Sequence, residues 1–124
     1  MKKIFITLGI CAFLFAWDGN KNDKSSTSKS VNVETFAKET NENNIQIIDV
    51  RTPVEFSEAH IKNAINIDYF SKSFSETISK LDKQKTILVY CAAGGRSTSA
   101  CSDFKKLGFK KVYNLIGGYD DWKE

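Results

Sequence analysis

The sequence predicts an α/β fold in which a parallel β-sheet is covered by helices on both faces. Short, apolar, β-branched runs typical of buried strands alternate along the chain with segments that have helical caps or helical periodicity. The chain has 124 residues, which is enough for one domain of this kind and not for two.

Residues 1–17 are expected to be an export signal or an N-terminal anchor. A basic start is followed by an apolar stretch too short for a stable membrane span. Its end, Leu14-Phe15-Ala16, resembles the sequence before the lipidated cysteine of bacterial lipoproteins, but position 17 is Trp17, so lipidation is not supported. We therefore expect a bacterial protein that is exported, either periplasmic or extracytoplasmic and membrane-associated, with a possible membrane tether through residues 1–17.

Residues 18–30 contain no large apolar side chain, which predicts a disordered polar linker before a domain over residues 31–124. The formal charge of the chain is +3, and residues 1–30 carry all of it, with five lysines against two aspartates. The domain itself has no net charge, which argues against a nucleic-acid partner.

The secondary structure of the domain follows from its apolar pattern and its capping residues. Thr52 and Glu55 have the spacing of a capping box, with Pro53 at the first helical position, so a short helix should begin there. Gly108 should end a helix, and Gly117 with Gly118 should turn the chain into a last short helix that carries Trp122. The other expected helices cover 33–39, 73–81 and 97–107, and the expected strands cover 45–50, 64–67, 86–90 and 111–115.

Cys91 is the strongest candidate for a reactive residue. It ends an apolar strand and is followed by a Gly-Gly loop and then by a helix start. Backbone N–H groups and the positive end of a helix dipole should lower the pKa of its thiol. Gly94 and Gly95 are expected to accept positive φ values that let the loop curl round the sulfur. The alternative is a small buried cysteine without chemistry, which the loop composition and the nearby Arg96 argue against.

Asp49, Arg51 and His60 are supporting candidates. Asp49 and Arg51 flank a strand end, where α/β proteins place their sites, and a structural ion pair is the favoured interpretation. His60 is the only histidine of the chain, and we expect a hydrogen-bonded structural residue rather than a general base. Cys101 should be a small buried residue on the helix after the loop, with a resolving thiol as the alternative. No metal site is expected, because Cys and His show no zinc spacing.

Together these motifs resemble a single-domain rhodanese, a sulfurtransferase, over residues 31–124. The motif residues are Asp49-Val50-Arg51, Glu55-Phe56, His60-Ile61, Ala64, Asn66-Ile67, Cys91-x-x-Gly94-x-Arg96-Ser97, Ala100 and Asn114-Leu115-x-Gly117-Gly118-x-x-x-Trp122. The resemblance implies a three-layer α/β/α fold with a five-stranded parallel sheet. The chain departs from the family's usual pattern at Ala59, where relatives usually have glycine, and at Asn63, where they often do. Ala92 and Ala93 offer no side-chain charge or hydrogen bond where many relatives carry a polar or basic residue, so the mouth of the pocket should be smaller and less polar.

By resemblance, Cys91 would accept a sulfane sulfur from thiosulfate or another persulfide donor and pass it to cyanide or a thiol. The binding loop would be Ala92, Ala93, Gly94, Gly95, Arg96 and Ser97, with Arg96 attracting a small anionic donor. No cofactor would be needed, because the sulfur is carried on the enzyme, and a monomer is expected.

Two other functions stay open at this point. The domain is also compatible with a sulfur carrier or binding module that a partner protein loads. A phosphatase or arsenate reductase is the weaker alternative. Sequences of that class have five residues between the cysteine and the arginine, which makes a loop wide enough for phosphate, whereas only four residues separate Cys91 from Arg96.

Overall fold

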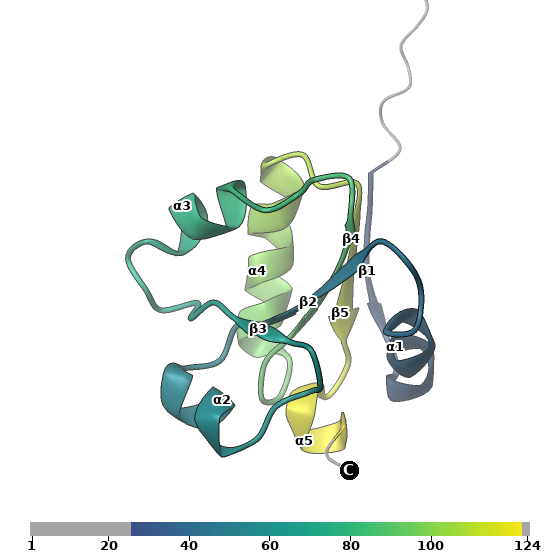
Figure 1. Cartoon of the computed structure of the whole chain (residues 1–124), viewed down its shortest axis with the longest axis vertical. Coiled ribbons are helices and arrows are strands. Elements are labelled where there is room, and N and C mark those ends of the chain that lie inside the picture. The colour runs from purple at the N-terminus through teal and green to yellow at the C-terminus, as the bar shows by residue number, and fades with distance from the viewer. Residues whose placement is uncertain (1–25, 123–124) are drawn as a thin grey trace, which may run out of the picture.

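In the computed structural model, which describes residues 26–122, a five-stranded parallel sheet lies between two layers of helices (Figure 1). The strands are β1 (Thr27–Val31), β2 (Ile45–Asp49), β3 (Ile65–Asn66), β4 (Thr86–Tyr90) and β5 (Lys111–Leu115). The helices are α1 (Val33–Glu39), α2 (Pro53–Glu58), α3 (Phe74–Ser79), α4 (Gly95–Lys106) and α5 (Gly118–Trp122). The strand order is β1-β5-β4-β2-β3, and every pairing is parallel. The predicted fold class is confirmed.

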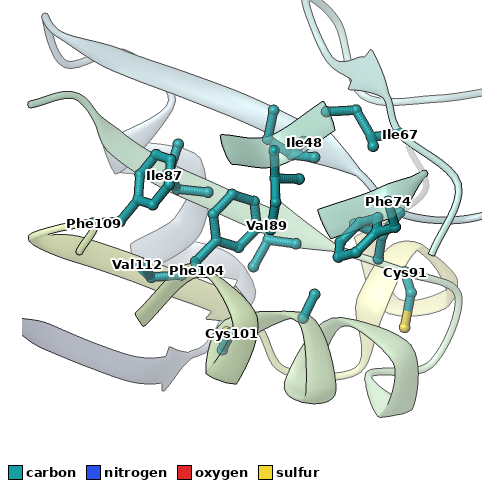
Figure 2. Packing of buried hydrophobic residues seen from close by; sticks show 13 residues of the cluster. Ile48, Ile67, Phe74, Ile87, Val89, Cys91, Cys101, Phe104, Phe109 and Val112 are labelled. Atoms are coloured by element: carbon teal, nitrogen blue, oxygen red, sulfur yellow. The ribbon is translucent and has the colours of Figure 1, made fainter. Parts of the chain in front are cut away.

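The sheet divides the core into two apolar clusters because neighbouring side chains of a strand point to opposite faces. In β4, Ile87 and Val89 pack toward α3 and α4, as Figure 2 shows, whereas Leu88 and Tyr90 pack toward α1 and α5. The same alternation places Cys91, the residue after β4, on the face that α4 covers.

Strand β1 corrects the predicted linker. Residues 27–30 were expected to be disordered, but they pair with β5 through the register Thr27 to Lys111 and Val31 to Leu115. Only Val31 of this strand is buried. A polar edge strand binds its neighbour through backbone groups, so its side chains carry no apolar pattern that would predict it. The ordered domain therefore begins before residue 31.

The expected helices and the other strands lie where the sequence predicts them, with boundaries shifted by no more than two residues. Helix α4 begins at Gly95, two residues before the expected Ser97. The capping box of α2 is present, with Pro53 at its first position. Residues 1–17 and the first part of the predicted linker lie outside the described residues. Between residues 26 and 122, no helix combines the length and the apolar character that crossing a membrane requires.

Candidate active site

Cys91 lies at the carboxyl end of the central strand, below the first turn of α4. The residue is 1% exposed. Its Sγ atom accepts a hydrogen bond from the Gly94 amide at 3.0 Å and one from the Ser97 hydroxyl at 3.4 Å. The loop from Cys91 to Ser97 therefore encloses the sulfur with donors, which is the environment that the sequence predicts.

These donors stabilise the thiolate. Burial alone would raise the pKa of Cys91, but hydrogen bonds from the Ser97 hydroxyl and from the amides of Ser97, Gly94 and Ala93 hold this pKa below its ordinary value. The N-terminus of α4, a helix of 12 residues, adds the positive end of its dipole. The same groups would stabilise any anion that replaces the thiolate in this position.

The two loop glycines behave differently. Gly94 has a φ of 115°, as the sequence predicts, and is the N-cap of α4. Gly95 is the first residue of α4 and does not have a positive φ, so the expectation for Gly95 is wrong. One left-handed residue is enough to reverse the chain, because the helix supplies the remaining amides.

Arg96 is held by Glu55 of α2. Its Nη1 atom donates to Oε1 at 2.9 Å, and its Nη2 atom donates to Oε2 at 3.2 Å. The Glu55 carboxylate is thus shared between the capping box of α2 and the loop of the cysteine. The hydrogen bond from Arg96, the largest cause, lowers the pKa of Glu55 to about 2. The sequence indicates the capping role of Glu55 but not this partner, which is 41 residues away.

Phe70 lies beside this ion pair. The Arg96 guanidinium lies 5.6 Å from the centre of the Phe70 ring, and Phe70 itself is 67% exposed. The sequence gives no signal for this placement, because Phe70 belongs to an irregular segment between β3 and α3.

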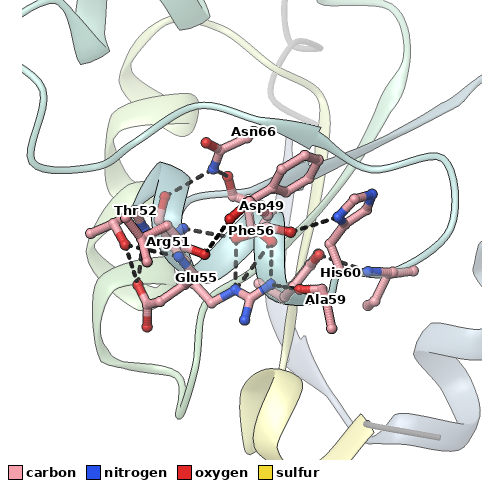
Figure 3. Close-up of polar contacts among 12 residues, drawn as sticks. Asp49, Arg51, Thr52, Glu55, Phe56, Ala59, His60 and Asn66 are labelled. Atoms are coloured by element: carbon pink, nitrogen blue, oxygen red, sulfur yellow. Dashed lines mark hydrogen bonds and ion pairs between the residues drawn. The ribbon is translucent and has the colours of Figure 1, made fainter.

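Asp49 and Arg51 form the structural ion pair that the sequence favours (Figure 3). The Arg51 Nη2 atom donates to Asp49 Oδ2 at 2.7 Å and to the Ala59 carbonyl at 2.6 Å. Both side chains are almost fully buried, and the Arg51 guanidinium lies 4.6 Å from the centre of the Tyr119 ring. This pair connects β2 to α5 and supports the site without touching the sulfur.

His60 is exposed and packs against the preceding helix, α2. Its ring stacks on Phe56 with the ring centres 3.6 Å apart, and its Nδ1 atom bonds the Phe56 carbonyl at 2.8 Å. Both contacts are with Phe56, which agrees with the structural role that we expect for this histidine (Figure 3).

The departures from the glycine pattern affect a turn. Asn63 has a φ of 70°, a left-handed conformation that glycine adopts most easily and asparagine tolerates. Ala59 is extended, with a φ of −172°, so its side chain causes no strain.

Cys101 is buried in α4, as expected, and it is a free thiol. Burial raises the pKa of Cys101 to about 11, against a smaller opposite effect of the Ser28 hydroxyl. Cys91 and Cys101 therefore have opposite chemical character although both side chains belong to the same apolar cluster.

A family model described as "Rhodanese-like domain" matches residues 32–124. A thiosulfate sulfurtransferase, GlpE, from Coxiella burnetii is 42% identical over 79 residues, which are 64% of this chain and 72% of the relative. The chloroplastic thiosulfate sulfurtransferase 16 of Arabidopsis thaliana is 36% identical over 85 residues, 60% of this chain and 71% of the relative.

A solved structure supports the same assignment. The crystal structure of a rhodanese-related protein from Thermoplasma volcanium superposes with a TM-score of 0.67 and 29% sequence identity, and the match covers 76% of this chain and 89% of that one. The sheet order, the cysteine loop and these matches agree, so the chain belongs to the rhodanese-like domain family.

Proposed function

We propose that this protein is a sulfurtransferase that moves a sulfane sulfur from thiosulfate or another persulfide donor to cyanide or a thiol, through a persulfide on Cys91. One observation carries the proposal: the buried Sγ atom is surrounded by hydrogen-bond donors from Gly94 and Ser97, which favour an anionic sulfur. The relatives named thiosulfate sulfurtransferases support the same class of donor.

The first step of the proposed reaction is attack by the Cys91 thiolate on the outer sulfur of thiosulfate. A new sulfur–sulfur bond forms on Cys91, the sulfur–sulfur bond of thiosulfate breaks, and its electron pair leaves with sulfite. The negative charge moves from the original sulfur to the terminal sulfur of the persulfide. The amides of the loop would stabilise both the thiolate and the persulfide anion, so hydrogen-bond donors surround the negative charge before and after the transfer.

The second step returns the enzyme to its starting state. Cyanide attacks the terminal sulfur, thiocyanate leaves, and the electron pair of the broken bond restores the Cys91 thiolate. With a thiol acceptor, the thiolate attacks in the same way and becomes the new persulfide. Neither step needs an external oxidant or reductant, because the transferred sulfur has the same oxidation level in the donor, in the persulfide and in the product.

Arg96 supports the choice of an anionic donor. A guanidinium has five N–H donors, and Glu55 accepts from only two of the Arg96 nitrogen atoms. The donors that Glu55 leaves free would bind the sulfonate oxygens of thiosulfate. Glu55 also fixes the direction of the guanidinium, so the arginine would meet the donor without first losing its rotational freedom.

The test is thiocyanate formation from thiosulfate and cyanide. The wild-type protein should turn over, Cys91→Ser should be inactive, and Cys101→Ser should stay active as the matched control. A wild-type protein that produces no thiocyanate but takes up sulfur from a persulfide donor would support the sulfur-carrier alternative instead. Activity that survives in Cys91→Ser would contradict the proposal.

Export remains part of the proposal. The basic and apolar composition of residues 1–17 supports it. Expression in a bacterium followed by fractionation should find the protein outside the cytoplasm, and removal of residues 1–17 should retain it inside. Identical fractionation of the two forms would contradict export through this segment.

A further inference from the structure

Helix α5 contacts the cysteine loop through its backbone. The Tyr119 amide donates to the Cys91 carbonyl at 2.7 Å, and the Asp120 amide donates to the Ala92 carbonyl at 2.9 Å. Figure 1 shows α5 next to the end of the sheet where the loop between β4 and α4 lies. The first turn of α5 therefore uses its free N–H groups to hold two loop carbonyls.

The hydrogen bond from Asp120 fixes the direction of a loop amide. The peptide that joins Ala92 to Ala93 is planar and trans, so its C=O and N–H groups point in opposite directions. When the Ala92 carbonyl points to α5, the Ala93 amide must point the other way. That amide is among the backbone groups that lower the pKa of Cys91, and the next amide of the loop, that of Gly94, donates to the sulfur at 3.0 Å. One peptide plane thus connects α5 to the reacting atom.

Gly118 permits this close approach. Its φ is 60°, and a Cβ atom built on it would lie 2.5 Å from the Cys91 carbonyl oxygen and closer still to the Ala92 carbonyl. These neighbours are backbone atoms of the loop, which cannot move without moving the donors around the sulfur. A Cβ atom on Gly117 would instead meet the side chain of Asp121, which can rotate away.

The rest of α5 is fixed by its aromatic side chains. The Tyr119 ring lies against the buried Arg51 guanidinium, and the Trp122 ring packs edge-on against Phe36 with the centres 6.0 Å apart. The helix is therefore anchored in the core independently of the loop. The distance between α5 and the loop is therefore set at Gly118, where the two backbones meet.

We propose that Gly118 is a positioning residue for Cys91: it lets the amides of α5 hold the loop carbonyls, so that the loop amides face the sulfur. The catalytic meaning of this inference rests on the proposed sulfur transfer. The inference itself concerns the ionisation of the thiol, which can be measured without any sulfur donor.

The first experiment compares Gly118→Ala with Gly108→Ala in the full chain. Both glycines have positive φ, at 60° and 93°, but a Cβ atom on Gly108 has no atom within 4 Å. Iodoacetamide labelling of Cys91, followed peptide by peptide by mass spectrometry, gives the rate against pH. We expect the midpoint of the Gly118→Ala profile to rise by about one pH unit, while Gly108→Ala keeps the wild-type midpoint.

A second pair of variants tests the hydrogen bond from Asp120. Asp120→Pro replaces the amide that donates to Ala92 by a ring carbon, which removes the bond and pushes the Ala92 carbonyl away, in the first turn of a helix, where proline is tolerated. Asp120→Ala keeps the amide and removes only the exposed carboxylate. We expect Asp120→Pro to raise the midpoint and Asp120→Ala not to raise it. If Gly118→Ala fails to fold, the comparison of Asp120→Pro with Asp120→Ala tests the inference instead.

A folded Gly118→Ala or Asp120→Pro protein that keeps the wild-type labelling profile would overturn the inference. Circular dichroism of each variant establishes folding before labelling. Wild-type protein that takes up no sulfur would contradict the proposed function and leave the labelling result unchanged, so the two failures are distinguishable.

Discussion

The carboxylate of Glu55 accepts two hydrogen bonds from the guanidinium of Arg96, at 2.9 and 3.2 Å. This pair joins α2 to the first turn of α4. The side chains are 33% and 21% exposed, so solvent reaches the pair but does not fully screen it.

We expect the pair to set how much positive charge an anionic donor meets. Arg96→Ala should raise the KM for thiosulfate about tenfold, because a charge-assisted hydrogen bond is lost. The KM for cyanide should change much less, since cyanide reacts with a persulfide already formed. Steady-state kinetics with each substrate varied in turn measures both values. Equal effects on donor and acceptor would contradict a role of Arg96 in donor binding.

The same pair predicts a loss of stability in acid. Arg96 holds the pKa of Glu55 at about 2, below its ordinary value of 4.5. A lowered pKa in the folded state stabilises the fold above pH 4.5, and this contribution disappears as the pH falls toward 2. After allowance for solvent screening we expect roughly 1–2 kcal/mol of the free energy of unfolding from this source.

Glu55→Gln is the matched variant for this prediction, because glutamine can keep the capping box. Urea unfolding at pH 7, 4.5 and 3 should show a flatter acid dependence for the variant than for the wild type. Parallel curves for the two proteins would show that Glu55 contributes nothing to acid sensitivity.

The buried ion pair of Asp49 and Arg51 should be essential for stability. Asp49→Asn leaves the Arg51 guanidinium buried without its counter-charge, which costs about 3–5 kcal/mol. The exposed pair of Lys80 and Glu76, 3.8 Å apart, is the internal control, and Glu76→Gln should leave the unfolding midpoint almost unchanged. Similar midpoints for Asp49→Asn and the wild type would contradict this assignment.

Cys101 should take no part in sulfur transfer. Its pKa of about 11 leaves it protonated at neutral pH, and the sulfur of a thiol is a poor nucleophile. Cys101→Ala should therefore transfer sulfur within about twofold of the wild-type rate, since only the thiolate reacts. A large loss of turnover after this change, with an intact fold, would instead support a resolving thiol.

The sequence predicts the fold well where side chains carry the pattern. Strand β4 is a continuous apolar run that is buried on both faces of the sheet, and Thr52, Pro53 and Glu55 have the spacing of the capping box that begins α2. Strand β1 is missed because it binds β5 through its backbone and buries only Val31. A polar edge strand and a polar linker have the same composition.

The site, like the fold, can be predicted from the sequence only where side chains carry the pattern. The cysteine, its loop and the low pKa can be predicted from one contiguous stretch, because a strand, a glycine and a helix start determine the local geometry. The partners that come from elsewhere cannot: Glu55 is recognised only as a cap, and the amides of Tyr119 and Asp120 have no side-chain signature. Gly118 is visible as a turn residue, but its contact with the loop depends on the packing of α5.

The intact mass of the full-length protein, recorded after thiosulfate and again after cyanide, decides whether Cys91 carries a persulfide. We expect a gain of one sulfur atom, about 32 Da, that cyanide removes and that Cys91→Ser does not show. A wild-type mass that stays unchanged with thiosulfate and with a persulfide donor would contradict the persulfide on Cys91.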